Sequence, residues 1–444
     1  MNKKYYIKTY GCQMNVYDSH RMAMMLENEG YVKADNQADA DLVLFNTCHI
    51  REKAAEKLFS DLGRELMIKN EREERHLGTV IGVTGCVVQA EDTEILRRAP
   101  YVDFALGPLT YHRLPQILKD IYAKKREHVV DTEFPAESKF DFLPENKAIS
   151  GCSFLAIQEG CNNFCTYCVV PYTRGVEYSR PVEDVLKEAK RLVSTGTLEI
   201  NLLGQNVNSY HGEDASGKER NLAYLLSKIA EIDGLKRLRY TTSYPADMTD
   251  ELISCHKDIG ILMPYLHLPV QSGSNKILKL MNRRHTRETY INIVQKLKEA
   301  NSKLEMSSDF IVGFPGETDD DFEQTLALVE EIGYIQAFSF KYSKRPGTPA
   351  ATMENQVPEK IKKERLDVLQ EKLFDMQNKF NVSCVGKTFE VLFEQTGRHK
   401  GQLIGRTPYM QNVHAEVSKE ALGQIRKVQI LSATTNSLEG KVVF

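Results

Sequence analysis

The sequence predicts an α/β protein built from three parts: an N-terminal doubly wound parallel sheet, a central incomplete (βα)6 TIM-like barrel and a small C-terminal all-β barrel. Three observations support this. A strand, a cysteine and a helix follow one another three times in the first 120 or so residues, six further strand and helix units come next, and short alternating strands fill the last part. A chain of 444 residues also exceeds what one hydrophobic core usually organises.

The N-terminal domain, residues 1–123, is predicted to place a cysteine at the end of each of three strands. KYYIKTYGC ends at Cys12, DLVLFNTC at Cys48 and TVIGVTGC at Cys86, and a helical stretch follows each one. In an open parallel sheet, ligands gather outside the carboxyl ends of the strands. We therefore expect the three cysteines to meet at one edge of the sheet. The alternative for each one is a small buried hydrophobic residue.

Residues 124–146 are polar, contain two prolines and show no sustained apolar period, so they are predicted to be a linker. In residues 147–377, strands are expected near positions 154, 199, 238, 265, 307 and 338, with helical patterns between them. This alternation predicts an incomplete parallel barrel with its active site at the carboxyl face. A doubly wound sheet is the alternative.

A second group of cysteines, Cys161, Cys165 and Cys168, forms the motif C-x3-C-x2-C after the first barrel strand. Four thiolates normally hold an iron–sulfur cluster, so three leave one iron open to a small ligand. The same reasoning predicts a second such cluster on the N-terminal three cysteines. A zinc site, the alternative, would need four ligands. Cys152, at the far end of the predicted strand, and the isolated Cys255 and Cys384 are expected to be structural.

Composition narrows the class of protein. Nine cysteines are an odd number for a disulfide framework, and no stretch has the length or apolar character of a signal peptide or a membrane span, so a cytoplasmic protein with no membrane partner is expected. The net charge of -3 excludes a chain that coats nucleic acid through bulk charge. Residues 379–444 nevertheless carry nine basic against five acidic residues, or +4, whereas the remainder has 49 against 56, or -7. The predicted β module, residues 380–444, belongs to a type that often binds RNA.

At this point the chain resembles a known family. The segment CNNFCTYC, with Tyr167 before its last cysteine, resembles the signature of radical S-adenosylmethionine enzymes. With the N-terminal cysteines and a β module similar to the TRAM domain, nearly the whole chain resembles the methylthiotransferases of that superfamily. YGCQMNVYDS, NTCHIREKA, CVVPYTRG, LLGQNVNSY, LHLPVQSGS and VGFPGET are similar to the branch that modifies tRNA. The relatives that modify a ribosomal protein usually differ after the first cysteine and after the C-x3-C-x2-C motif.

The resemblance implies a reaction and its cofactors. Two 4Fe-4S clusters and S-adenosyl-L-methionine are implied, with all six cysteines acting in catalysis and as metal ligands. The implied reaction is methylthiolation at carbon 2 of N6-(dimethylallyl)adenosine at position 37 of tRNA, with the anticodon stem-loop as partner, an external electron donor and a monomeric enzyme. Two alternatives remain. One is the same chemistry on threonylcarbamoyladenosine in tRNA or on a ribosomal protein, and the other is a non-catalytic iron–sulfur regulator that binds RNA.

The resemblance also suggests which other residues contact ligands. Those expected near S-adenosylmethionine are Tyr167, Gly204, Gln205, Asn206, Gln271, Ser272 and Ile311. Gln205 stands where the family often has an acid, and QSGS could equally be only a turn. Those expected at RNA are Arg398, Lys400, Arg406 and Tyr409, for which solvated surface is the alternative. His267 is expected to be a satisfied core histidine and Arg174 a solvated or packing arginine, with a ligand contact as the alternative for each.

Overall fold

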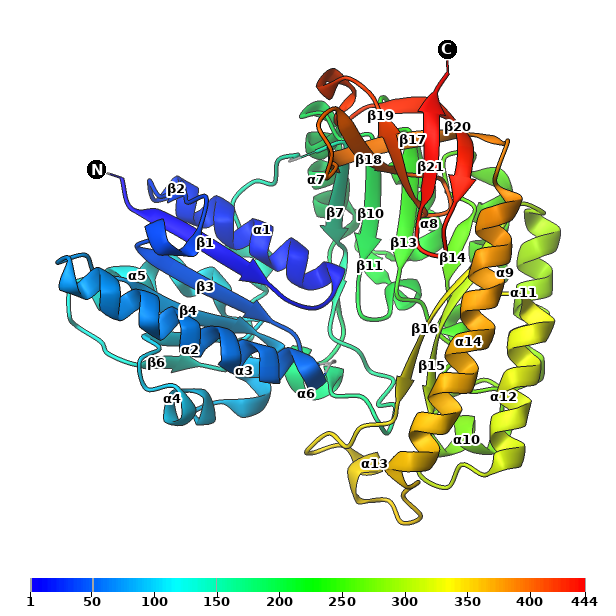
Figure 1. Ribbon diagram of the computed structural model, residues 1–444, viewed down its shortest axis with the longest axis horizontal. Coiled ribbons are helices and arrows are strands. Elements are labelled where there is room, and N and C mark those ends of the chain that lie inside the picture. Colours follow the sequence, from blue (N-terminus) through cyan, green and yellow to red (C-terminus); the bar gives the residue numbers. More distant parts are fainter. Residues whose placement is uncertain (1, 50–51, 149, 444) are drawn as a thin grey trace. The chain divides into compact units, whose positions relative to one another are not determined.

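The computed structural model describes residues 2–49, 52–148 and 150–443, and the chain in it forms two compact units (Figure 1). The first unit comprises Met1–Asn146, Glu159–Asn162 and Val169–Glu177. The second comprises Lys147–Gln158, Asn163–Cys168 and Tyr178–Phe444. Of the three cysteines in the barrel motif, Cys161 belongs to the first unit, whereas Cys165 and Cys168 belong to the second.

A six-stranded, all-parallel sheet forms the core of the first unit. Its strands are β1 (Lys4–Thr9), β2 (Val32–Lys33), β3 (Leu42–Thr47), β4 (Val80–Gly85), β5 (Phe104–Leu106) and β6 (Val129–Asp131), in the spatial order β2-β1-β3-β4-β5-β6. Strands β3 and β4 are buried along their whole length. The pairs Thr9↔Asn46 and Thr47↔Gly85 bring the carboxyl ends of β1, β3 and β4 level with one another.

Helices cover both faces of this sheet, which confirms the doubly wound prediction. Helices α1 (Gln13–Asn28) and α5 (Leu114–Tyr122) pack on one face, and α2 (Glu52–Glu74), α3 (Cys86–Glu91) and α4 (Glu94–Arg98) on the other. Alternate strand residues supply the two cores, with Leu44 facing Leu26 and Phe45 facing Leu62. Ile50 and Arg51, which open the predicted second helix, lie outside the described residues.

Residues 124–146 differ from the expected linker, because they contribute the edge strand β6 and the short helix η3 (Lys139–Phe142) to the first unit. The Lys139 side chain within η3 is buried. Three strand residues are too few to show a hydrophobic period, so the sequence carried no signal for β6.

The second unit contains the predicted incomplete barrel. Six parallel strands form two three-stranded sheets, β7-β10-β13 and β14-β15-β16, which the parallel bridge Leu238↔Leu262 links. The strands are β7 (Cys152–Ala156), β10 (Glu199–Leu203), β13 (Arg237–Thr241), β14 (Tyr265–His267), β15 (Glu305–Val312) and β16 (Gln336–Lys341). The helices packed around them are α7 (Val182–Ser194), α8 (Leu222–Ala230), α9 (Asp250–Asp258), α11 (Arg287–Ala300), α12 (Asp319–Ile332) and α14 (Glu359–Ser383).

A closed five-stranded barrel ends the chain, as predicted. Strands β17 (Thr388–Thr396), β18 (Gln402–Arg406), β19 (Asn412–Glu416), β20 (Ile425–Ala433) and β21 (Leu438–Val442) close in the order β17-β18-β19-β21-β20 (Figure 1). Its core includes Val391, Phe393 and Ile430. None of the helices in the described part of the chain has the length and apolar character needed to cross a bilayer.

Candidate cluster sites and the loops beside them

Three adjacent strands of the first unit each lead directly into one of the N-terminal cysteines. Cys12 follows β1, Cys48 follows β3 and Cys86 follows β4, and these strands are neighbours in the sheet. The Cys12 and Cys48 side chains share a hydrogen bond, and the charge on Cys12 is close enough to Cys86 to influence its pKa. The three cysteines are separated by 36 and 38 positions in the sequence, and the parallel sheet brings them to one of its edges.

A helix N-terminus favours the thiolate form of Cys12. Cys12 is the N-cap of α1 and Cys86 is the first residue of α3. The pKa of Cys12 is lowered to about 6, chiefly by the hydrogen bond with Cys48, although burial opposes this change. The charge of Arg174 and the backbone N–H groups of Asn15 and Met14 also lower it. Burial raises the pKa of Cys86, and Arg174 acts against that increase. A metal ion removes the proton of a coordinating thiol outright, so the higher pKa of Cys86 does not prevent ligation.

Two buried asparagines support the ends of these strands. The Asn15 amide donates to Oδ1 of Asn46 at 3.1 Å and to the Thr47 carbonyl at 2.8 Å, while the Asn46 amide donates to the Asn15 carbonyl at 2.8 Å. The Cys12 thiol in turn donates to Oδ1 of Asn15 at 3.2 Å. Buried polar networks of this kind fix side-chain orientation when their members are satisfied.

A square of four buried charges lies in the same unit. Arg174 contacts Glu159 at 2.6 Å and Asp18 at 2.9 Å, and Lys139 contacts Glu159 at 2.6 Å and Asp18 at 3.3 Å. All four side chains are at most 5% exposed. Asp18 lies on α1, six residues after Cys12. The sequence predicted a solvated or packing role for Arg174 and gave no signal for Asp18, Lys139 and Glu159, because partners up to 156 residues apart leave no local pattern.

The donor set of the N-terminal triad fits an iron–sulfur cluster. It consists of three thiols, which would leave one iron of a bound 4Fe-4S cluster without a protein ligand. No three His, Cys, Asp or Glu side chains in the described part of the chain are arranged to hold a single metal ion. Soft thiolate ligands without imidazole or carboxylate partners favour an iron–sulfur cluster over a four-ligand zinc site.

The second unit contributes Cys165 and Cys168 from the barrel motif. The Cys168 N–H donates to the Cys165 carbonyl at 2.9 Å, and the Arg283 guanidinium lies 3.7 Å from the buried Cys165 sulfur. Tyr167, between the two cysteines, packs against a buried cluster that includes Phe314. The loop is thus anchored inside its own unit. Arg283 is a further residue that the sequence did not single out.

The loop after β10 holds three of the residues predicted to contact S-adenosylmethionine. A Cβ atom at Gly204 would lie 2.5 Å from Oε1 of Gln158, so the position has no room for a side chain. Asn206 is buried, and its amide donates to Asp247 at 2.7 Å. The Oδ1 atom of Asn206 has no hydrogen-bond partner among the described residues, so this buried acceptor is available to an ammonium group. Gln205 lies between them in the same loop.

The loop after β14 holds Gln271 and Ser272. Gln271 is buried and has a φ of +77°, and its backbone joins β15 through a 3.0 Å bond to Asp309 and a 2.9 Å bond from Ile311. A left-handed non-glycine residue of this kind stores strain, which is common at ligand sites. The Ser272 hydroxyl instead accepts the Ser274 N–H at 3.2 Å and lies 3.3 Å from the Thr325 hydroxyl. It therefore shapes the QSGS turn.

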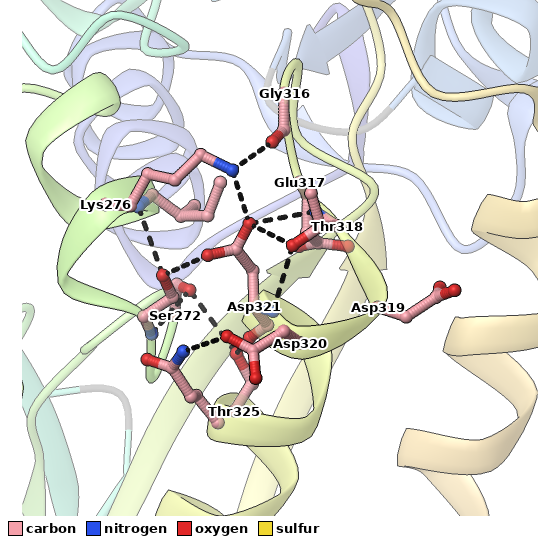
Figure 2. A network of polar contacts seen from close by, with 12 residues as sticks. Ser272, Lys276, Gly316, Glu317, Thr318, Asp319, Asp320, Asp321 and Thr325 are labelled. Atoms are coloured by element: carbon pink, nitrogen blue, oxygen red, sulfur yellow. Dashed lines mark hydrogen bonds and ion pairs between the residues drawn. The ribbon is translucent and has the colours of Figure 1, made fainter.

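Figure 2 shows the polar network that joins this turn to the loop after β15. The Asp321 carboxylate on α12 accepts from Ser274 at 2.6 Å, from Lys276 at 2.7 Å and from the N–H and hydroxyl of Thr318 at 2.9 and 2.7 Å. Lys276 also donates to the Gly316 carbonyl at 2.8 Å. Burial opposes these bonds, yet together they hold the pKa of Asp321 well below its usual range. One carboxylate thus ties together two loops at the end of the barrel.

The inner strands carry a polar group that the sequence only partly indicated. His267 on β14 lies 2.9 Å from the Ser307 hydroxyl and 3.5 Å from Asp309, both on β15. Tyr265, Ser307, Asp309 and Ile311 share its strand alternation. Alternation identifies a common face, but only the strand order shows that these residues are neighbours.

The residues predicted to meet RNA fall into two groups. Arg398 and Lys400 are exposed in the turn between β17 and β18. Arg406 forms an ion pair with Glu394 at 3.2 Å, and Tyr409 packs edge-on against Phe380 and Phe389. The first two are accessible side chains, whereas the last two also hold the β-barrel together.

The remaining cysteines have local surroundings. Cys255 packs in the barrel core, and Cys384 lies in the core of the β-barrel with its sulfur 3.3 Å from the Phe380 carbonyl. Cys152 is half-buried at the start of β7, and burial followed by the charge of Glu199 raises its pKa well above the usual value. These surroundings match the structural roles expected for them.

Each of the three parts of the chain matches a known protein family or domain. Residues 4–107 match the uncharacterized protein family UPF0004, residues 155–329 match the radical SAM superfamily, and residues 382–443 match the TRAM domain. A protein of Rickettsia canadensis (strain McKiel) is 54% identical over the full length of both chains, and one of Agrobacterium fabrum (strain C58 / ATCC 33970) is 55% identical over 99% of this chain and 98% of its own. Both are named tRNA-2-methylthio-N(6)-dimethylallyladenosine synthase.

Solved structures resemble the fold at low sequence identity. The radical S-adenosylmethionine methyltransferase TsrM from Kitasatospora setae aligns with a TM-score of 0.57 and 14% identity, over 79% of this chain and 77% of its own. The cobalamin-dependent S-adenosylmethionine radical enzyme OxsB aligns with a TM-score of 0.53 and 13% identity, over 84% of this chain and 58% of its own. At such identities the likeness concerns the fold alone.

Proposed function

From the premise that this chain belongs to the family of tRNA-2-methylthio-N(6)-dimethylallyladenosine synthases, we propose that it adds a methylthio group to carbon 2 of N6-(dimethylallyl)adenosine at position 37 of tRNA. The observation that carries this proposal is identity of 53% to 55% with such relatives over essentially the whole chain. The presence of the radical SAM and TRAM domains agrees with an enzyme that uses S-adenosylmethionine and acts on RNA.

In this proposal Cys161, Cys165 and Cys168 hold a 4Fe-4S cluster with one open iron. When bound there, the cluster supplies the electron that cleaves S-adenosylmethionine to a 5′-deoxyadenosyl radical. An external donor must deliver that electron. The chain's own residues hold the reactants in place: Arg283 sets a positive charge beside the Cys165 sulfur, and the buried Oδ1 of Asn206 offers an acceptor for the ammonium of S-adenosylmethionine.

Gln271, Ser272 and Ile311 are proposed to complete the surroundings of S-adenosylmethionine. Gln271 is held in its left-handed conformation by two backbone bonds, one of them from Ile311. Ser272 acts indirectly by shaping the turn, and the Asp321 network keeps that turn and the β15 loop together. Preorganised loops reduce the entropy lost when the ligand binds.

We further propose that Cys12, Cys48 and Cys86 would hold a second 4Fe-4S cluster, which would supply the sulfur for the transfer. Support comes from three thiols at the ends of adjacent strands, from helix N-termini beside two of them and from the lowered pKa of Cys12. We propose that the anticodon stem-loop binds through the TRAM barrel with the exposed Arg398 and Lys400, and that the protein acts as a monomer.

Four measurements test these proposals. Mass analysis of tRNA from cells that lack the gene should show loss of the 2-methylthio group, and an unchanged level would refute the assigned reaction. Supplying the purified enzyme with threonylcarbamoyladenosine tRNA or a ribosomal protein tests the alternative substrates. Iron counting on anaerobic protein should give two clusters, with Cys12→Ala and Cys165→Ala each losing a different one. A regulator without catalysis would release no 5′-deoxyadenosine under strong reductant.

A further inference from the structure

Arg174 occupies an unusual position for a residue that the sequence links to the barrel motif. It lies six residues after Cys168, yet its segment, Val169–Glu177, packs as part of the first unit. There α6 (Val170–Arg174) contacts α3, the helix that begins at Cys86. Its guanidinium also donates to Asp18 on α1, the helix capped by Cys12. Arg174 therefore stands between two helices that each begin at a triad cysteine.

Two buried carboxylates hold the guanidinium in place. It contacts Asp18 at 2.9 Å and Glu159 at 2.6 Å, with the side chain 3% exposed. Lys139 contacts the same two carboxylates, so each carboxylate has a second cation besides Arg174. Buried ion pairs seldom add net stability, because the cost of removing the charges from water is high. Stability alone is therefore a weak reason for this square.

We propose that Arg174 is a positioning residue that places a fixed positive charge beside the sulfur ligands of the N-terminal cluster and raises its reduction potential. The inference rests on the proposed function, since it requires a cluster on Cys12, Cys48 and Cys86. Three thiolates make that site strongly negative, and reduction adds one more electron. Net charge and hydrogen bonds to the sulfur atoms set the potential of iron–sulfur clusters, and a cation held nearby stabilises the reduced state.

The first unit offers a matched control in Arg72. Its side chain is 8% exposed and donates to Asp41 at 2.7 Å and to the Thr79 hydroxyl at 2.8 Å. Asp41 and Thr79 precede β3 and β4, whereas Cys48 and Cys86 follow them. Arg72 is thus a buried, ion-paired arginine at the opposite end of the same strands.

The test is a redox titration, followed by electron paramagnetic resonance, of full-length anaerobic protein. A background with Cys165→Ala and Cys168→Ala leaves only the N-terminal cluster to report. In this background, Arg174→Gln should move the midpoint to a more negative value. At fixed potential the ratio of reduced to oxidised cluster should fall at least about tenfold, which is about 59 mV for a one-electron couple. Arg72→Gln should leave the midpoint unchanged.

A charge-balanced variant covers the possibility that Arg174→Gln does not fold. Arg174→Gln with Glu159→Gln removes one cation and one anion, so no unpaired buried charge remains. Glu159 lies on β8 and belongs to neither of the helices that begin at Cys12 and Cys86, so its loss should affect the cluster less than the loss of Arg174, and the double variant should still shift the midpoint negatively. An unchanged midpoint in a variant that retains its iron overturns the role of Arg174. Absence of iron from the background protein itself overturns the N-terminal cluster instead.

Discussion

Cys48 fills the space that a side chain at Gly11 would need. A Cβ atom at Gly11 would lie 2.2 Å from the Cβ atom of Cys48 and 3.0 Å from its sulfur, and the φ of Gly11 is +109°. The glycine before Cys86 is similarly restricted, because a Cβ atom at Gly85 would lie 2.3 Å from the Thr47 carbonyl. Two glycine–cysteine pairs therefore let neighbouring strand ends approach one another closely.

We expect Gly11→Ala to remove the N-terminal cluster and retain the barrel cluster. The new methyl group would displace Cys48, and the left-handed conformation adds about 1–3 kcal/mol of strain. Iron content of anaerobic protein should fall by about half, and 5′-deoxyadenosine release without methylthiolation should persist. Gly30→Ala is the control, because Gly30 also has a positive φ, +84°, but has open space around it. Equal iron loss in both variants would contradict the steric argument.

Much of this arrangement is accessible from the sequence. Each predicted barrel strand begins within two residues of an observed one, and five of these six strands, among them β10 and β15, have the five to eight residues needed to carry a clear apolar pattern. The position of each triad cysteine at the end of its strand can also be predicted from the residues next to it in the sequence. Parallel pairing then makes their meeting a consequence of topology.

Other features depend on contacts that no local pattern records. Strand β6 has three residues and lies in a segment that resembles a linker. The partners Arg174 and Asp18 are 156 residues apart, and each is unremarkable alone. The spacing of the C-x3-C-x2-C motif likewise does not show that Cys161 belongs to one unit and Cys165 and Cys168 to the other.

We expect Asp321→Asn to weaken the binding of S-adenosylmethionine. An amide can accept fewer of the bonds from Ser274, Lys276 and Thr318, so the two loops should separate. We expect a loss of about 2–3 kcal/mol in unfolding free energy and a several-fold rise in KM for S-adenosylmethionine in the cleavage assay. Because the Asp321 pKa is lowered in the folded state, its contribution exists above its ordinary pKa of 3.8 and is lost as pH falls.

Asp320→Asn is the control for this change. Asp320 is the preceding residue of α12, is exposed, and accepts one bond from the Gln324 amide at 2.7 Å. Its replacement should alter neither KM nor unfolding free energy measurably. If the two variants behave alike, the Asp321 network does not organise the site.

We expect Arg237→Met to weaken tRNA binding without affecting cleavage of S-adenosylmethionine. Arg237 pairs with Glu199 at 3.3 Å and donates to the Glu390 carbonyl at 2.7 Å and the Arg406 carbonyl at 3.2 Å, so it fastens the β-barrel to the (βα)6 barrel. A loosened RNA-binding barrel should raise Kd for the anticodon stem-loop about tenfold, or about 1.4 kcal/mol. Fluorescence anisotropy measures this.

The matching control is Arg220→Met, which breaks a 2.6 Å ion pair with Asp214 beside the β11–β12 hairpin (His211–Glu213 and Glu219–Asn221). Within the described residues, this ion pair joins two side chains of the hairpin and does not involve the β-barrel. Unchanged stem-loop affinity in Arg237→Met would mean that the two barrels stay fixed without this arginine.

We expect Glu65→Gln to stabilise the protein at neutral and alkaline pH. Burial raises the pKa of Glu65 from 4.5 to about 7, and one carboxyl oxygen accepts from Gln37 at 2.8 Å while the other has no partner among the described residues. Below pH 4.5 the carboxyl is protonated in both the folded and the unfolded protein. Between pH 4.5 and about 7 the unfolded protein ionises first, so folding stability falls as pH rises. A neutral glutamine avoids this loss and should be more stable by about 1–2 kcal/mol at pH 8.

Melting temperatures of anaerobic protein at pH 5 and pH 8 should show the two proteins nearly equal at the lower pH and Glu65→Gln higher at the upper one. Glu71→Gln, which changes an exposed residue of the same helix, should show no such divergence.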